Sequence, residues 1–290
     1  MKIALGTVQF GLEYGIANQS GRVRFEDARH ILEQAAAHGI NTLDTAIAYG
    51  ESERTLGRLG VANWNLVTKL PELPHDCADV DKWVSTQIEY SVTRLGVSQL
   101  HGVLLHRPVQ LLGAFGKQLS DSMLRLKAQG TTRKIGVSIY SPEELARIID
   151  VMPLDLVQAP LNILDQRLVE SGWANRLTDL GIELHARSAF LQGLLLMSPE
   201  QRPLKFSGFN SIWTEWSRWL EYTGFTPIQA CLGYVLNISA VNKVVVGLDS
   251  AAHLKEIIAT SQMQLKLPSL PNWKPPIATD LISPDRWSQL

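Results

Sequence analysis

Short apolar runs recur along the chain, and each is followed by a segment in which apolar residues repeat with helical spacing. Runs such as GVLLH and KVVVG are almost wholly apolar, which is typical of strands buried on both faces of a parallel sheet. The predicted strands cover residues 3–8, 41–45, 65–70, 100–106, 134–139, 156–159, 183–188 and 241–247. Their strict alternation with helices predicts an α/β fold, a (β/α)8 TIM barrel formed by residues 1–290 as a single domain. A doubly wound open sheet is the alternative, although it usually needs fewer strands and no closure.

The helical segments carry recognisable start and stop signals. Several of them end in a glycine just before the next apolar run, where a residue with positive φ closes a helix. These glycines are Gly39, Gly96, Gly130 and Gly181. Ser141 and Thr226 each stand before a proline, which predicts a capping residue followed by proline at the first helical position.

Two regions break this alternation. Residues 194–226 separate the seventh strand from its helix, which is too long for an ordinary βα loop and predicts a functional segment or a lid. Within it, Trp213, Trp216 and Leu220 form a helical stripe that either packs the segment onto the barrel or forms an aromatic wall over a site. Residues 263–290 form a proline-rich C-terminal extension, predicted to be draped on the barrel or mobile, and not helical.

Composition narrows the classes of partner. The formal charge is −1, with 45% hydrophobic and 19% charged residues, and no run of like charges suggests binding to nucleic acid or to an anionic membrane. Cys77 and Cys231 form no CxxC pair, which argues against a disulfide scaffold or a structural zinc site. No signal peptide or long apolar segment is present. We therefore expect a cytoplasmic protein that binds a small molecule, with no metal site.

Polar side chains stand at the ends of neighbouring predicted strands, where barrel enzymes carry their chemistry. Asp44 ends the second strand, Lys69 the third and His106 the fourth. Tyr49 lies in the loop after Asp44. A phenol with an ordinary pKa of about 10 is a weak acid at neutral pH, and a neighbouring ammonium stabilises its phenolate. The pattern predicts that Lys69 acts on Tyr49, that Asp44 keeps Lys69 charged, and that His106 orients a carbonyl oxygen.

The same stretches resemble the aldo-keto reductase superfamily over nearly the whole chain. The matching pieces, in order, are LGTVQFG, LDTAIAYG, VTKL, LLHRP, IGVSIYSPEEL, LVQAPLNILDQR, HARSAFLQGLLL and VVVGLDSAAHLKEI. The resemblance implies an oxidoreductase that reduces an aldehyde or ketone, such as a sugar, by direct hydride transfer. It implies NADP(H) as cofactor, with NAD(H) as the alternative. Tyr49 is then the proton donor, tuned by Lys69 and Asp44, with His106 beside it.

The resemblance also assigns residues to the cofactor. These are Gly6, Thr7, Ser138, Gln158, Arg187, Ser188, Gln192, Gly193, Gly247, Ser250, His253 and Glu256. Three positions depart from the family pattern. Ile139 replaces the usual asparagine after Ser138, Arg187 replaces an aromatic residue that stacks on the nicotinamide, and His253 replaces an arginine that meets the 2′-phosphate.

Substrate contacts are predicted at the barrel rim, and two other functions stay open. The predicted substrate residues are Phe10, Tyr14, Arg107 and Trp213. A Schiff-base aldolase is one alternative, because a lysine at a barrel strand end also suits imine chemistry, although the pairing of Lys69 with Asp44 speaks against it. The other is a regulatory barrel that binds the cofactor with little turnover.

Overall fold

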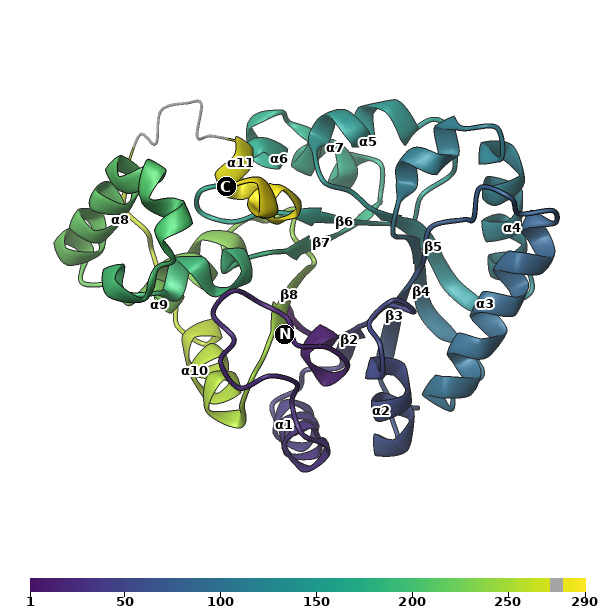
Figure 1. Cartoon of the computed structure of the whole chain (residues 1–290), viewed down its shortest axis with the longest axis horizontal. Helices are drawn as coiled ribbons and strands as arrows, with labels where there is room; N and C mark the ends of the chain where they lie inside the picture. Colours follow the sequence, from purple (N-terminus) through teal and green to yellow (C-terminus); the bar gives the residue numbers. More distant parts are fainter. Residues whose placement is uncertain (272–278) are drawn as a thin grey trace.

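Parallel strands close into a barrel in the computed structural model, which describes residues 1–271 and 279–290. Figure 1 shows the strands at the centre and the helices around them. The strands are β1 (Ile3–Gly6), β2 (Thr42–Asp44), β3 (Asn65–Leu70), β4 (Leu100–Leu105), β5 (Thr132–Ser138), β6 (Leu156–Pro160), β7 (Glu183–Arg187) and β8 (Lys243–Gly247). Closure comes from β8, which pairs with β1 so that Ile3 lies opposite Val244. The predicted (β/α)8 barrel is confirmed.

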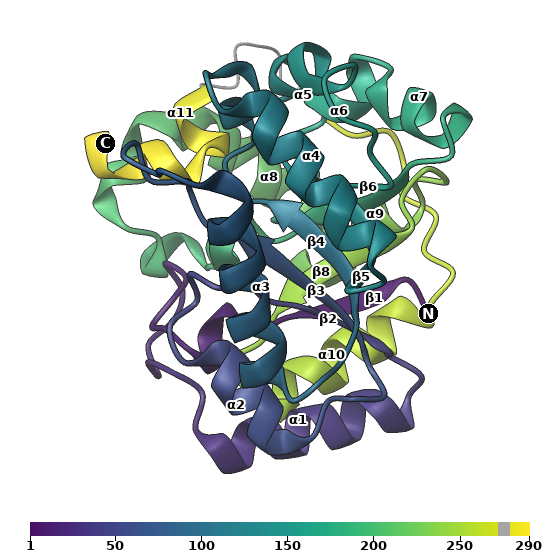
Figure 2. The ribbon, with the colours of Figure 1, turned by 90° about the vertical axis from the view of Figure 1, so that its right-hand side faces the viewer.

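Helices cover the outside of the barrel, and Figure 2 shows α3 and α4 on its outer face. They are α1 (Phe25–Ala37), α2 (Ser52–Leu59), α3 (Val80–Leu95), α4 (Gly116–Ala128), α5 (Pro142–Ile148), α6 (Arg167–Glu170), α7 (Trp173–Asp179), α8 (Asn210–Thr223), α9 (Pro227–Leu236), α10 (Ala251–Ser261) and α11 (Thr279–Ile282). The predicted stop glycines 39, 96, 130 and 181 all have positive φ, between 68° and 77°. The side chains of Ser141 and Thr226 accept hydrogen bonds at the starts of α5 and α9, as predicted.

The long segment after β7 is not an open loop. It contains the short 3₁₀ helices η3 (Leu191–Leu196), η4 (Pro199–Gln201) and η5 (Leu204–Phe209), followed by α8. Trp213, Trp216 and Trp219 of α8 are buried in a second apolar cluster that is separate from the barrel core. Packing this cluster removes apolar surface from water, which fixes the segment beside α9.

The prediction of a C-terminal extension without helix is wrong for its last residues. Residues 279–290 form α11 and the 3₁₀ helix η6 (Pro284–Gln289). Leu281, Ile282 and Trp287 join the second apolar cluster, where the ring centroids of Trp287 and Phe206 of η5 are 5.0 Å apart. Prolines lower local helix propensity, but burial of these side chains in the second apolar cluster decides the structure here. Residues 272–278 of the predicted extension lie outside the described residues.

A buried ion pair outside the rim joins α2 to α3. Glu53, 1% exposed, accepts hydrogen bonds from Arg94, Thr68 and Ser91. We expect Glu53→Gln to lower the free energy of unfolding by about 3 kcal/mol, because it leaves the Arg94 guanidinium without its countercharge. Urea denaturation measures this change. The control is Glu51→Gln, which removes an exposed pair with Arg54 and should change the unfolding free energy by about 0.5 kcal/mol or less. Equal losses in the two variants would contradict the prediction.

In the part of the chain that the structure describes, no helix combines the length and apolarity required to cross a bilayer. The same residues contain no group of three or more histidine, cysteine, aspartate or glutamate side chains arranged to hold a metal ion.

Candidate active site

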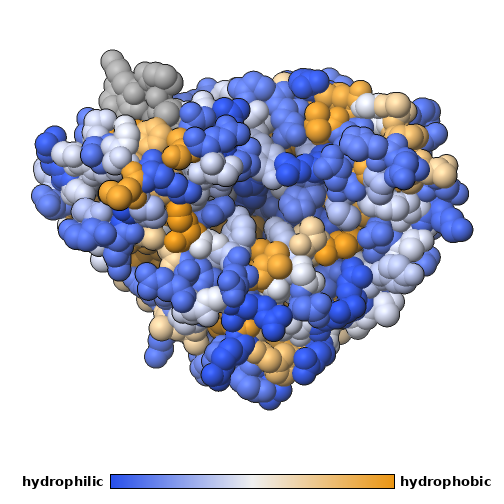
Figure 3. Space-filling model, viewed as in Figure 1, coloured by the Kyte–Doolittle hydropathy of each residue, from blue (hydrophilic) through white to orange (hydrophobic). Residues whose placement is uncertain are grey.

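A cavity of about 720 Å³ lies at the carboxyl ends of the strands. The space-filling view shows this face hollowed near its centre (Figure 3). The predicted residues that line the cavity are Gly6, Thr7, Tyr14, Asp44, Tyr49, Lys69, His106, Ser138, Gln158, Arg187, Ser188, Gln192, Gly193, Gly247, His253 and Glu256. The barrel thus brings together side chains that are far apart in the sequence.

Lys69 is the most constrained side chain at the rim. It is 1% exposed, and its Nζ donates to Asp44 Oδ1 at 2.6 Å and to the Thr45 carbonyl at 2.8 Å. Burial alone would lower the pKa of Lys69, but the Asp44 carboxylate and the Tyr49 hydroxyl raise it, and the net direction is upward. A buried ammonium is costly unless it is paired. Asp44 therefore holds Lys69 in its charged form.

Tyr49 and His106 lie next to this pair. Lys69 Nζ lies 3.4 Å from the Tyr49 hydroxyl oxygen, and the ring centroids of Tyr49 and His106 are 6.0 Å apart in an edge arrangement. Burial, followed by the positive charge of Lys69, lowers the pKa of His106 to about 4. The imidazole is therefore neutral near pH 7, where it has one N–H to donate to an acceptor.

Two glycines allow the loop that carries Tyr49 to approach the first strand. A Cβ on Gly11 would lie 1.8 Å from the Tyr49 carbonyl oxygen, so only glycine fits there. Gly50, directly after Tyr49, has φ of 55°. Below the loop, Thr7 Oγ1 donates to the Asp44 carbonyl and lies 2.9 Å from Ser52 Oγ. These contacts fix the end of β2 relative to β1.

A chain of hydrogen bonds connects the predicted nicotinamide residues to Asp44. Gln158 Nε2 donates to Asp44 Oδ2 at 2.7 Å, and Ser138 Oγ donates to Gln158 Oε1 at 3.4 Å. Both carboxylate oxygens of Asp44 thus have a donor, because Gln158 donates to Oδ2 and Lys69 donates to Oδ1. Ile139 is fully buried and contributes no polar side chain.

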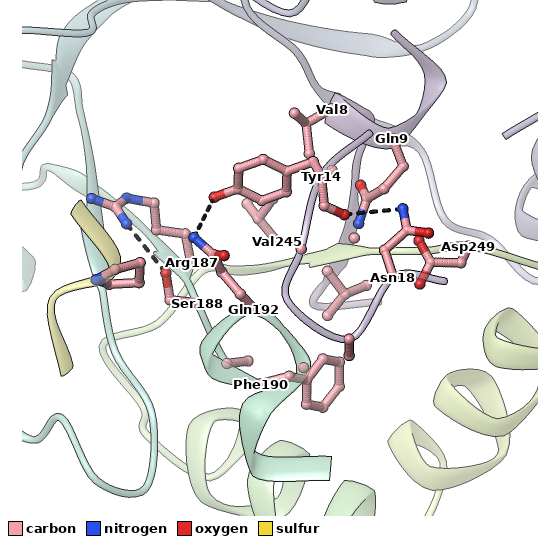
Figure 4. Close-up of a pocket in the computed structure, with 18 of the residues that line it drawn as sticks. Val8, Gln9, Tyr14, Asn18, Arg187, Ser188, Phe190, Gln192, Val245 and Asp249 are labelled. Atoms are coloured by element: carbon pink, nitrogen blue, oxygen red, sulfur yellow. Dashed lines mark hydrogen bonds between the residues drawn. The ribbon is translucent and has the colours of Figure 1, made fainter. Parts of the chain in front are cut away.

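Arg187 is held at the cavity wall. Its guanidinium donates to the Ile139 carbonyl at 2.9 Å and lies 4.9 Å from the centroid of the Tyr140 ring. It also donates to Ser188 Oγ, as Figure 4 shows. A guanidinium can lie against an aromatic ring, and here that ring belongs to Tyr140.

The loop after β7 has an unusual backbone. Among the described residues, the non-glycine positions with positive φ are Ser188, Leu191 and Gln192. Such conformations are costly and concentrate at functional sites. Gln192 Nε2 donates to the Tyr14 hydroxyl at 3.1 Å, which closes this side of the cavity (Figure 4).

At the opposite end of the cavity, β8 leads into α10. His253 and Glu256 line the cavity there, as predicted. Ser250 does not line it, because its hydroxyl caps α10 by accepting from the His253 backbone N–H. The cofactor contact expected of Ser250 stays a prediction, and the structure shows its side chain in the cap of α10.

Of the predicted substrate residues, only Tyr14 lines the cavity. Phe10 is 1% exposed in the barrel core, and Trp213 is buried in the second apolar cluster, where its indole N–H donates to the Phe206 carbonyl. Arg107 does not line the cavity itself, and its guanidinium lies 5.3 Å from the centroid of the Tyr140 ring, which does line it. The structure therefore brings Tyr14 to the cavity wall, but not Phe10, Trp213 or Arg107.

Several lining residues were not anticipated from the sequence. Gln9 lies three residues after the end of β1 and Asp249 two residues after the end of β8, so a search of the loops after strand ends could have found them. Pro284 and Asp285 belong to the tail and line the cavity because residues 279–290 pack into the second apolar cluster, where Trp287 contacts Phe206. No local signal in the sequence predicts that contact.

The sequence model of the Aldo/keto reductase family matches residues 2–273, so the chain belongs to this family. An aldo-keto reductase of Mycobacterium sp. (strain KMS) is 36% identical over 186 residues, which is 60% of this chain and 63% of that protein. The chloroplastic pyridoxal reductase of Arabidopsis thaliana is 27% identical over 194 residues, covering 59% of this chain and 52% of that protein. The match thus spans less than two thirds of the length of either relative.

Solved structures of the same fold agree with the barrel. The holo form of an aldo-keto reductase from Bacillus halodurans superposes with a TM-score of 0.73 at 19% identity, covering 92% of this chain and 88% of that one. An aldo-keto reductase structure from Pseudomonas aeruginosa gives a TM-score of 0.68 at 23% identity, with 91% of each chain covered. At these identities the likeness concerns the fold.

Proposed function

We propose that the protein reduces a small aldehyde or ketone, such as a sugar, to an alcohol with NAD(P)H, and that Tyr49 supplies the proton. The observation that carries this proposal is the buried Lys69 ammonium, 2.6 Å from an Asp44 oxygen and 3.4 Å from the Tyr49 hydroxyl. Aldo-keto reductases generally use NAD(P)H and act on small carbonyl compounds. Membership of this family and the arrangement at the rim therefore support the same reaction.

The cavity suits a nicotinamide dinucleotide. It extends from Lys69 and His106 to Glu256 on α10, and the buried oxygens Gln9 Oε1 and Asp249 Oδ1 lack protein partners among the described residues. Ser138 and Gln158 would hold the nicotinamide amide, the loop after β7 the pyrophosphate, and the start of α10 the adenosine. When bound, the reduced cofactor supplies the hydride.

The rim residues have separate roles in this proposal. The Tyr49 hydroxyl donates its proton to the carbonyl oxygen as negative charge develops there. Lys69 stabilises the phenolate that remains, and Asp44 holds Lys69 in place. The neutral His106 imidazole donates an N–H to the same carbonyl oxygen and orients it.

The Schiff-base alternative requires a neutral lysine as nucleophile. The upward shift in the pKa of Lys69 and its short contact with Asp44 oppose that form. The low-turnover regulatory barrel differs from the proposed enzyme in rate alone, so an activity measurement separates the two.

The test is to mix the purified protein with NADH or NADPH and a panel of aldehydes, ketones and sugars. Absorbance of the reduced nicotinamide follows turnover. Substrate-dependent oxidation of the cofactor would support the proposal. Tight cofactor binding without turnover across the panel would favour the regulatory barrel, and trapping of a substrate on Lys69 by borohydride would favour the aldolase.

The low pKa of His106 predicts the acid side of the pH profile. Because that pKa is about 4, the neutral donor persists as pH falls through the ordinary histidine value of 6.5 and is lost only near 4. The ratio of kcat/KM between the parent and His106→Gln should therefore stay constant between about pH 5 and 7. A ratio that declines with a midpoint near 6.5 would contradict the neutral role of His106.

A further inference from the structure

Two buried hydrogen-bond acceptors lie at the α10 end of the cavity. Gln9 is 8% exposed, and its Oε1 has no partner among the described residues. Asp249 Oδ1 is also buried and lacks a partner within that part of the chain. Both residues line the cavity, and Figure 4 draws them on one side of it, away from Arg187 and Ser188. A buried acceptor without a donor is costly, so the pair indicates a ligand that donates hydrogen bonds.

The neighbouring polar side chain of Asn18 does not satisfy them. Asn18 Nδ2 donates to the Tyr14 and Gly21 carbonyls, and its Oδ1 accepts from the Ser20 and Gly21 backbone N–H groups. Its hydrogen-bonding capacity is thus used within its own loop. An amide can turn either its oxygen or its NH2 group to a ligand, so Gln9 accepts several ligand chemistries. The carboxylate of Asp249 has only acceptors and is therefore the selective group.

The charges at this end of the cavity are mainly negative. Asp249 and Glu256 line it, and His253 is the basic side chain that lines it there among the described residues. The other strong cations on the cavity wall are held elsewhere, Lys69 by Asp44 and Arg187 by the Ile139 carbonyl. Burial raises the pKa of Asp249, although His253 opposes the shift. Burial disfavours the charged carboxylate of Asp249 because its Oδ1 has no donor among the described residues. A bound ligand with O–H groups would supply such donors.

We propose that Asp249 accepts hydrogen bonds from the ribose hydroxyls of the adenosine, and that the protein consequently binds NAD(H) in preference to NADP(H). This rests on the proposed function, because it concerns the cofactor of that site. A ribose diol offers two O–H donors, whereas a 2′-phosphate offers acceptors and nearly two negative charges. In dinucleotide sites of another fold, an acidic side chain binds the 2′-hydroxyl and an arginine the 2′-phosphate. This proposal differs from the NADP(H) preference that the resemblance implies.

The amino end of α10 does not compensate for this charge. A helix N-terminus favours negative groups, but the Asp249 carboxylate already stands next to the N-cap residue Ser250. A 2′-phosphate would meet that carboxylate in a partly buried site. His253 is exposed and is a weak, pH-dependent partner for phosphate.

Equilibrium binding tests the proposal without turnover. Isothermal titration calorimetry of the parent protein would compare the dissociation constants of NAD⁺ and NADP⁺. It would also compare ADP-ribose with 2′-phosphorylated ADP-ribose, a pair that lacks the nicotinamide and therefore reports on the adenosine end alone. We expect the forms without the 2′-phosphate to bind at least about tenfold more tightly in both pairs.

Substitution of Asp249 should remove this selectivity. Asp249→Asn keeps the shape, removes the charge, and is expected to reduce the NAD⁺ to NADP⁺ preference about tenfold. Asp249→Arg should reverse the preference by adding a cation for the 2′-phosphate. The matched control is Asp150→Asn, an exposed carboxylate that does not line the cavity, which should keep the parent preference.

The outcomes separate this inference from the proposed function. Equal or tighter binding of NADP⁺ by the parent would overturn the inference and leave carbonyl reduction standing. Selective binding of NAD⁺ without any carbonyl reduction would support the inference and overturn the proposed function. Failure of all four ligands to bind would overturn both.

Discussion

Tyr49→Phe is expected to lower the rate constant for carbonyl reduction by about two to four orders of magnitude while the cofactor binds as in the parent. The substitution removes the hydroxyl that lies 3.4 Å from Lys69 Nζ. The aromatic ring remains, so its edge contact with His106 is kept. Single-turnover absorbance measures the rate, and a fluorescence titration measures the dissociation constant of the cofactor.

The matched control is Tyr222→Phe on α8. Tyr222 is 83% exposed and does not line the cavity, so loss of its hydroxyl should leave both quantities unchanged. If Tyr49→Phe reduced carbonyls as fast as the parent, Tyr49 would not be the proton donor. Equal loss of cofactor binding and rate would instead indicate a general disturbance of the cavity.

Lys69→Met is expected to abolish measurable reduction and to lower the free energy of unfolding by about 3–5 kcal/mol. The substitution leaves the Asp44 carboxylate, 3% exposed, without the ammonium that neutralises it. It also removes the charge that stabilises the Tyr49 phenolate. Denaturant unfolding and the single-turnover assay measure the two effects.

A double variant separates these effects. Lys69→Met with Asp44→Asn removes both charges, and the new amide can still accept a hydrogen bond from Gln158. We expect it to recover part of the lost stability and none of the activity. The control Lys117→Met removes a lysine whose side chain is 85% exposed and should change stability by about 0.5 kcal/mol or less. Recovery of turnover in the double variant would contradict the role of Lys69.

The barrel could be predicted because its signals are local. Apolar runs mark strands that are buried on both faces, and Gly96 and Gly181 mark helix ends through their backbone conformation. The tail could not be predicted in this way. Its prolines argue against a helix, whereas α11 depends on Leu281 and Ile282 packing into the second apolar cluster, whose other members are far away in the sequence.

The candidate site likewise contains residues that the sequence could predict and residues that it could not. Strand ends can be read from the sequence, which brought Asp44, Lys69 and His106 to one cavity. The spacing of Trp213 shows that its helix has an apolar face, but not what covers that face. Asp249 stands at a strand end too. The resemblance directed attention to His253 instead, and the structure shows that Asp249 lines the cavity with an unpartnered oxygen.

The fate of the cofactor hydrogen tests carbonyl reduction at this site most directly. The protein would be supplied with a dinucleotide that carries deuterium at both C4 positions of the reduced nicotinamide and with a carbonyl substrate in ordinary water. Mass spectrometry of the alcohol should find one deuterium on the carbinol carbon, with formation greatly slowed in Tyr49→Phe. An alcohol without deuterium, or one formed equally fast by Tyr49→Phe, would contradict direct hydride transfer with Tyr49 as proton donor.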